Sequence, residues 1–302
     1  MNSIKDILVI VDPTASDQPA VAKAAVLAAQ FKASIELVVC ETQHARKVSP
    51  KSSPLRLHTW LESLAASLRV QGITVRTSTI AGDPLYATLL NWIHNSPADL
   101  VIKDTHHHSA VKRTPLGNTD WHLIRECRLP LLLTKPTLWH ERPAIAAAID
   151  PHATRRRSAL LDRRILECAV QFAGAIKATV HAIHVILPAI LTALSDSRVP
   201  RTSSTAPQIL AAMAAVRREG IKTLVAPYDI LNGRLHVEIG TPAESLPQLA
   251  QEHQIDIIVM GSISKIHAKQ ALIGSTAERA LERLPCDILM IKETDFGESL
   301  PF

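Results

Sequence analysis

Aromatic residues are scarce in this 302-residue chain and make up only 3% of it. Proteins that bind single-stranded nucleic acid by stacking bases need aromatic platforms, so the composition disfavours that class. With 47% hydrophobic residues overall, the interior must be built from Ala, Val, Leu and Ile, which fits two small aliphatic sheet cores. The formal net charge of +5 is mild for this length. It permits an anionic ligand, and we expect no nucleic-acid partner.

Cysteines and long hydrophobic runs are also lacking. The four cysteines lie far apart and form no C-x-x-C pair, which disfavours a zinc ribbon or a redox motif and makes a reduced, cytoplasmic location the default. The first apolar run is short and ends at Asp12-Pro13, so we interpret it as a strand and not as a signal peptide. No stretch reaches the roughly 20 apolar residues of a membrane span.

Three common catalytic and nucleotide-binding motifs are missing. The sequence contains no G-x-x-x-x-G-K-[ST] loop, no G-x-G-x-x-G after its first strand and no G-x-S-x-G elbow. These absences argue against a P-loop NTPase, a dinucleotide-binding enzyme and the usual serine hydrolase. No set of nucleophile, base and orienting residue stands out, so a dedicated enzyme is not the first expectation.

The chain repeats itself. Residues 99–103 (DLVIK) resemble 256–260 (DIIVM), and the same offset of 157 maps Gly117 onto Gly274 without a gap. At 302 residues the chain also exceeds the about 100–150 residues of a common domain, so we interpret it as one domain written twice. We place the first domain at 1–136, a linker at 137–143, the second domain at 144–294 and a tail at 295–302.

Within each half, apolar strands alternate with amphipathic helices, which predicts a parallel sheet covered by helices on both faces. We predict helix caps at Ser16 or Asp17, at Asp83 with Pro84 in the first helical position, at Ser158, and at Thr241 in a capping box with Glu244. The last strand of each half, 131–134 and 288–291, is an apolar edge. We expect these two edges to pair, because exposed edges of this kind invite aggregation.

Candidate ligand-binding residues cluster in the second half. Ligands of open parallel sheets bind at the carboxyl ends of the strands, where Asp150 ends the first strand, His184-Val185 ends the second and the segment 261–276 follows the fourth. A helix begins near 275, and its free N–H groups favour an anion. Gly274 lets the backbone approach a phosphate. Two readings of Ser275 stay open, since Ser275-x-x-Glu278 is also a capping box.

The duplicated pattern resembles a tandem universal stress protein over nearly the whole chain. The family's nucleotide motif is Gly, two residues, Gly, nine residues, Gly and then Ser or Thr. Gly261, Gly274 and Ser275 match it, and Ser264 stands where the middle Gly belongs. The resemblance implies an α/β fold with two tandem Rossmann-like (HUP-type) domains, each an open five-stranded, mostly parallel sheet with helices on both faces.

The resemblance also implies a ligand and its contacts. In ATP-binding members the positions matching Asp150, Val185, Met260 and Gly261 lie beside the nucleoside. Those matching Gly274, Ser275 and Thr276 lie beside the phosphates. Ser264 departs from the pattern, and its side chain would either crowd the phosphate path or donate a further hydrogen bond.

The first half departs further from the motif. The offset puts Asp104 at the position of Gly261 and His107 at that of Ser264. A carboxylate at the entrance of the loop repels phosphate, so we expect the first half to bind ATP poorly or not at all. Asp104, His106 and His108 are candidate ligands for zinc, although adjacent histidines cannot all face one ion and a solvated loop is the simpler interpretation.

The leading expectation is a cytoplasmic, regulatory stress-response protein whose second half binds ATP or a related adenine nucleotide. One alternative is a module that binds a lipid or another small hydrophobic molecule within the Ala-rich interior. Another is a weak ATPase that uses a carboxylate such as Asp150. We expect the two halves to form an intramolecular pseudo-dimer, and a further homodimer of chains stays open.

Overall fold

The computed structural model describes residues 4–42, 54–105, 118–151, 156–186, 206–230, 232–262 and 280–292. The first half contains β1 (Asp6–Ile10), α1 (Pro19–Phe31), β2 (Ser34–Glu41), α3 (Pro54–Val70), β3 (Val75–Ala81), α4 (Leu85–His94), β4 (Leu100–Asp104), α5 (Asn118–Glu126) and β5 (Leu131–Thr134). The second contains β6 (Ala144–Ala148), α6 (Arg156–Ile176), β7 (Thr179–Ile186), α8 (Ala206–Val225), the short 3-10 helices η1 (Ala226–Tyr228) and η2 (Asn232–Arg234), β8 (Leu235–Ile239), α9 (Pro242–Glu252), β9 (Ile257–Ser262) and β10 (Asp287–Lys292).

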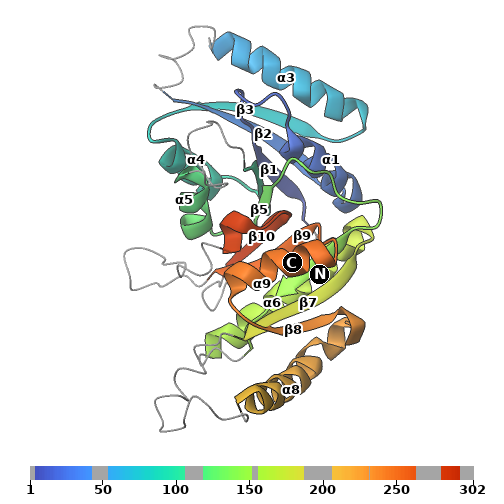
Figure 1. The fold of residues 1–302 in the computed structure, drawn as a ribbon. Helices are drawn as coiled ribbons and strands as arrows, with labels where there is room; N and C mark the ends of the chain where they lie inside the picture. The colour runs from blue at the N-terminus through green and yellow to red at the C-terminus, as the bar shows by residue number, and fades with distance from the viewer. Residues whose placement is uncertain are drawn as a thin grey trace.

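One ten-stranded sheet runs through the whole molecule, in the order β3-β2-β1-β4-β5-β10-β9-β6-β7-β8 (Figure 1). The five strands of each half are parallel to one another, as the alternation of strands and helices predicted. The halves meet where β5 and β10 pair antiparallel, with Leu132 opposite Leu289. The expected pairing of the two apolar edges is therefore confirmed, and it joins the two sheets into one.

Two hydrophobic cores flank this sheet, and each of them spans both halves. One contains the inner sides of α1, α3 and α6. The other contains those of α4 and α9 together with buried residues of 280–284. The cores thus correspond to the two faces of the sheet and not to the two halves. They are continuous because β5 and β10 carry buried side chains toward both faces.

Helices α1 and α6, which occupy equivalent places in the two halves, contact each other on one face of the sheet. In α6, Leu161, Ile165, Cys168 and Phe172 recur at helical spacing and are all buried, as expected of an amphipathic helix. Phe172 meets Phe31 of α1 edge to face, with ring centroids 5.8 Å apart. Figure 1 shows α3 and α8 at the two far ends of the sheet.

A buried ion pair ties α1 to the other half. The Lys23 ammonium lies 2.8 Å from the Asp287 carboxylate at the start of β10, and both side chains are 2% exposed. Asp287 also accepts hydrogen bonds from the backbone N–H of Lys135 (2.7 Å) and the indole N–H of Trp139 (2.8 Å). Because every oxygen of Asp287 has a partner, the charge is tolerated in the interior.

Two predicted helix caps in the first half are wrong. The N-cap of α1 is Gln18, which makes no side-chain cap bond, so neither Ser16 nor Asp17 starts this helix. Pro84 is the N-cap of α4 and not its first residue, because its extended ψ of 154° delays the helix to Leu85 and leaves Asp83 outside.

The predictions of helix caps in the second half are partly correct. Ser158 does not start its helix, because α6 already includes it from Arg156. Thr241 is the N-cap of α9, as predicted, but it makes no cap bond to the backbone. Its hydroxyl donates instead to the Glu244 carboxylate over 2.9 Å.

Candidate functional site

The carboxyl ends of β6, β7 and β9 meet at the switch point of the second half. From β6 the chain proceeds outward to β7 on one side and later returns to β9 on the other, which is where open α/β sheets bind ligands. Ala148 lies opposite both Ile183 of β7 and Met260 of β9. The register therefore brings Asp150, Val185, Met260 and Gly261 to the same end of the sheet.

These residues differ in exposure and polarity, which suits a ligand that has both a polar and an apolar part. The Asp150 side chain is 69% exposed. Val185 and Met260 are half-buried and pack against the same core as Ala148, on the α4 and α9 face. The site thus offers two aliphatic side chains beside a carboxylate that can accept hydrogen bonds.

Two buried polar side chains hold the segment that carries Asp150. The carboxylate of Asp162, in α6, accepts the backbone N–H of Asp150 over 2.9 Å and is 3% exposed. The buried ring of His184 lies with Nδ1 3.0 Å from the carbonyl of Ile149. A carbonyl can only accept, so this nitrogen carries the proton.

Burial sets the protonation of both groups. It raises the pKa of Asp162 to about 6, an effect that the nearby Asp150 charge reinforces and the hydrogen bond from the Asp150 N–H opposes. Burial likewise lowers the pKa of His184, which favours the neutral ring. Asp162 was not among the predicted site residues, because its role depends on the direction in which α6 presents this side chain to the end of β6.

Gly261 has a packing reason to be glycine. A Cβ at this position would lie 2.6 Å from Cδ2 and 2.7 Å from Cγ of Leu161, and 3.0 Å from Cδ1 of Ile165. Helix α6 therefore presses directly on the end of β9. The glycine permits this contact whether or not a ligand is bound.

The equivalent residue of the first half behaves differently. Asp104 is 3% exposed, and its Oδ1 accepts hydrogen bonds from the backbone N–H of Ala20 (2.7 Å) and the hydroxyl of Thr134 (2.5 Å). Asp104 therefore supplies the cap that Gln18 does not, and its negative charge faces the positive end of α1. The start of α1 thus draws this carboxylate inward, although Asp104 stands at the end of β4 where the loop begins.

Several predicted site residues lie outside the described residues. These are Ser264, Gly274, Ser275 and Thr276 of the phosphate segment, together with His106 and His108 of the candidate metal site. Within the described ranges there is no group of three or more His, Cys, Asp or Glu side chains arranged to hold a metal ion. Asp104 is engaged with Ala20 and Thr134. All four cysteines are free thiols.

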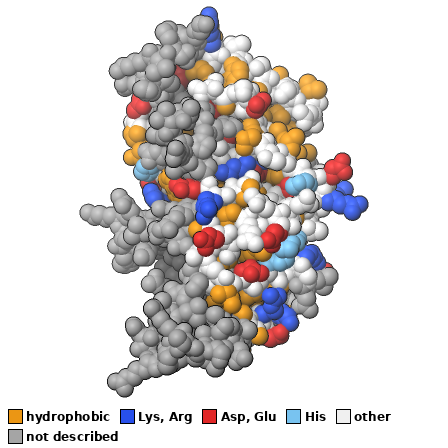
Figure 2. All heavy atoms as spheres, viewed as in Figure 1, with side chains coloured by type: hydrophobic (Ala, Val, Ile, Leu, Met, Phe, Trp, Pro, Cys, Tyr) orange, Lys and Arg blue, Asp and Glu red, His pale blue; other side chains and the backbone are white. Residues whose placement is uncertain are grey.

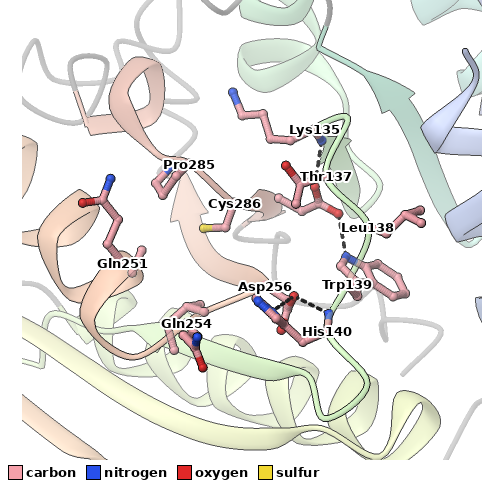
Figure 3. Close-up of a pocket in the computed structure, with 13 residues that line it drawn as sticks. Lys135, Thr137, Leu138, Trp139, His140, Gln251, Gln254, Asp256, Pro285 and Cys286 are labelled. Carbon is pink, nitrogen blue, oxygen red and sulfur yellow. Dashed lines mark hydrogen bonds and ion pairs between the residues drawn. The ribbon is translucent and has the colours of Figure 1, made fainter.

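A pocket of about 330 Å³ lies at the opposite, amino end of β9 and β10 (Figure 3). The segment 135–140 forms one wall, and the end of α9 with Pro285 and Cys286 forms the other. Asp256 fastens this wall by accepting hydrogen bonds from the His140 backbone N–H (2.9 Å), the His140 ring (2.8 Å) and the Ala144 N–H (2.9 Å). Asp256 thus anchors the connecting segment that forms this wall.

No helix in the described part of the chain is both long and apolar enough to span a membrane.

Comparison with known proteins identifies the fold. The sequence pattern of the universal stress protein family matches residues 3–135 and again 157–292. Universal stress protein E of Escherichia coli K12 is 24% identical over 312 residues, which cover 98% of this chain and 96% of that protein.

Solved structures agree over the same length. The crystal structure of PA1789 from Pseudomonas aeruginosa PAO1, described as functionally unknown, is 27% identical with a TM-score of 0.76 and covers 97% of this chain and 94% of its own. A universal stress protein from Archaeoglobus fulgidus shares the fold with a TM-score of 0.65 at 17% identity, covering 96% and 97% of the two chains. The chain therefore belongs to the universal stress protein family and carries two of its units in tandem.

Proposed function

We propose that this stress protein acts in the cytoplasm as a regulatory, ligand-binding protein, and that its second half binds ATP or a related adenine nucleotide. The binding site lies at the carboxyl ends of β6, β7 and β9 and continues into the segment 263–279. The first half, with Asp104 in place of the motif's first glycine, does not bind the nucleotide.

The observation that carries this proposal is the convergence of four motif residues at the switch point. Asp150 presents an exposed carboxylate that accepts hydrogen bonds from ribose hydroxyls. Val185 and Met260 supply aliphatic surface against which a purine can pack. Gly261 brings the end of β9 without a side chain to the point where the phosphate motif begins.

The site is also rigid on its nucleoside side. Asp162 and His184 bind the backbone on either side of the Ile149–Asp150 peptide, so Asp150 does not have to be ordered when the ligand arrives. Preorganised groups of this kind improve affinity, because less conformational entropy is lost on binding.

Equilibrium binding of a fluorescent ATP analogue to the full chain tests the proposal. We expect saturable binding that unlabelled ATP displaces. Gly274→Val should abolish it, because a branched side chain blocks the backbone's approach to the phosphates. The matched control is Gly117→Val, the equivalent substitution in the first half, which should leave binding unchanged. Absence of saturable binding, or equal effects of the two variants, would overturn the proposal.

Two further measurements separate the alternatives. Mass spectrometry of small molecules extracted from the purified protein should find an adenine nucleotide, and a lipid in its place would favour the hydrophobic-ligand alternative. Phosphate release by the same samples should stay at the buffer rate. Release that disappears in Asp150→Asn would identify a weak ATPase.

A further inference from the structure

Three histidines lie together on the α9 face of the second half. His181 comes from β7, His236 from the neighbouring strand β8, and His253 directly follows α9 as its C-cap. The ring centroids are 4.0 Å apart for His236 and His253, 5.2 Å for His181 and His236, and 5.7 Å for His181 and His253. We call these three residues the histidine cluster. Figure 2 views the side of the molecule on which histidine side chains reach the surface of this half.

The cluster is not a requirement of the fold. Aligning the paired strands of the two halves places Glu36 at the position of His181 and Ser78 at that of His236. There the Ser78 hydroxyl donates to the Glu36 carboxylate over 2.7 Å, which is an ordinary cross-strand hydrogen bond. The second half replaces this pair with imidazoles that titrate near neutrality when unperturbed.

The geometry of the cluster limits how many protons it can hold. Nδ1 of His181 lies 2.9 Å from Nε2 of His236, so one of these nitrogens donates and the other accepts. An imidazolium has two N–H groups and no acceptor. If both rings were charged, two N–H groups would point at each other and the hydrogen bond would be lost.

The surroundings add to this limit. Arg234 of η2 and Arg218 of α8 bring positive charge toward the cluster, while Glu252 of α9 opposes it and Glu238 lies further along β8. Burial, followed by the charges of the other histidines and these arginines, lowers the pKa of both His181 and His236 to about 4. Both rings are therefore neutral in the folded protein at pH 7.

We propose that the histidine cluster is an acid-sensitive joint that holds the edge strand β8 and the end of α9 onto the sheet, and that releases them when it takes up protons. Strand β8 is the last strand of the sheet, so only β7 pairs with it. Local opening there exposes an unpaired strand of the second half and leaves the central strands intact.

The direction of the effect follows from proton linkage. A histidine whose folded pKa lies below its unfolded value of about 6.5 binds more protons when unfolded, so stability is complete above pH 6.5. It is lost as the pH falls from about 6.5 to about 4. Unfolding of β8 and α9 in this window takes up to about two protons, one for each shifted ring.

The test combines urea unfolding of the full chain between pH 7.5 and 4.5, in EDTA, with hydrogen exchange corrected for the intrinsic pH dependence. The double variant H181Q/H236S imitates the Glu36–Ser78 pair without a titrating group. We expect its unfolding constant to depend less steeply on pH, by up to about two protons. Exchange at pH 5 should accelerate in β8 and α9 of the wild type but not in β3 and α4.

The matched control is H94Q, an exposed histidine at the end of α4, the first-half counterpart of α9. It should behave like the wild type. Equal pH slopes for the wild type and the double variant would overturn the proposal. NMR titration of the His181 and His236 ring protons gives a second test that needs no variant to fold. Midpoints near 4 support the joint, and midpoints near 6.5 overturn it.

Discussion

Helices α1 and α6 occupy equivalent places in the two halves but begin at different points. Each is followed directly by a lysine in the left-handed conformation, Lys32 with φ 56° and Lys177 with φ 55°, and a strand begins two residues after the lysine. Counted back from these lysines, α1 has 13 residues and α6 has 21. The extra two turns of α6 lie at its N-terminal end, beside the candidate ligand site.

This difference in length explains the most visible departure between the two repeats. Where α1 begins, the free N–H of Ala20 is capped by Asp104 at the end of β4. In α6, Leu161 of the extra turns and Ile165 pack against the end of β9, where Gly261 leaves room for them. A residue that looks like a degraded nucleotide motif is therefore also the partner of a helix terminus. Motif positions in duplicated domains have to be judged together with the packing around them.

The largest expected effect concerns the buried ion pair of α1, which has no equivalent in α6. Lys23 of α1 pairs with Asp287, whereas the equivalent position of α6 is the buried Cys168. Lys23→Met leaves a buried carboxylate without its counter-charge and should lower the free energy of unfolding by about 3–5 kcal/mol. Urea unfolding at pH 7 measures this loss.

The control for this prediction is Lys222→Met, which breaks the exposed pair with Glu219 and should cost about 1 kcal/mol or less. Adding Asp287→Asn to Lys23→Met should recover part of the stability, because no unpaired charge remains. A loss in Lys23→Met as small as in Lys222→Met would contradict the prediction.

Transferring the first half's residue to the second is expected to have the next largest effect. Gly261→Asp forces a side chain against Leu161 and buries a carboxylate, so it should cost about 3 kcal/mol. Gly261→Ala should cost less, about 1–2 kcal/mol. In a double-mutant cycle measured by urea unfolding, Leu161→Ala should relieve the strain of Gly261→Ala. Strict additivity of the two substitutions would show that the contact is not the cause.

The reverse transfer removes a remote helix cap. Asp104→Gly leaves the Ala20 N–H and the Thr134 hydroxyl without their acceptor and should cost about 2 kcal/mol. Hydrogen exchange of the first turn of α1 should accelerate with it. Asp17→Ala, at the exposed position where the sequence suggested a cap, should change stability by at most about 0.5 kcal/mol. A larger effect at Asp17 than at Asp104 would reverse the assignment.

The smallest effect concerns Asp162, whose counterpart counted back from the left-handed lysines is the exposed Asp17. The folded pKa of Asp162 is raised to about 6, so ionisation is unfavourable in the folded state and stability is lost as the pH rises from about 4 to about 6. Asp162→Asn should therefore stabilise the protein at pH 7.5 by about 1 kcal/mol and give no advantage below pH 4. Equal effects of Asp162→Asn on the free energy of unfolding at pH 7.5 and below pH 4 would contradict this prediction.

The sequence predicted the features that depend on local periodicity and on the repeat. The buried stripe of α6 follows from apolar residues at helical spacing, and the pairing of β5 with β10 follows from two apolar edges in equivalent places. The caps were predicted less well, because a local sequence pattern can indicate only caps that come from neighbours in the chain. Asp104 is 84 residues from Ala20, and no local pattern reports that distance.

The candidate site likewise contains residues that the sequence predicted and residues that only the tertiary structure revealed. Asp150, Val185, Met260 and Gly261 could be named from the ends of predicted strands, since parallel strands place their carboxyl ends together. Asp162 could not, because its role depends on the direction in which α6 presents a polar side chain to the end of β6. The histidine cluster could not be predicted from the sequence either, since its three members come from separate elements.

By itself, the sequence determined that an α/β unit is repeated and that the second copy kept more of a phosphate-binding pattern. Composition and periodicity are enough for this, because they decide which segments can be buried. Only the tertiary structure decided that the two sheets merge, that the cores follow the faces and not the halves, and that Asp104 serves a helix. The physical reason is that strand pairing, capping and ion pairing join atoms far apart in the chain, and their partners are chosen only when the packed elements meet.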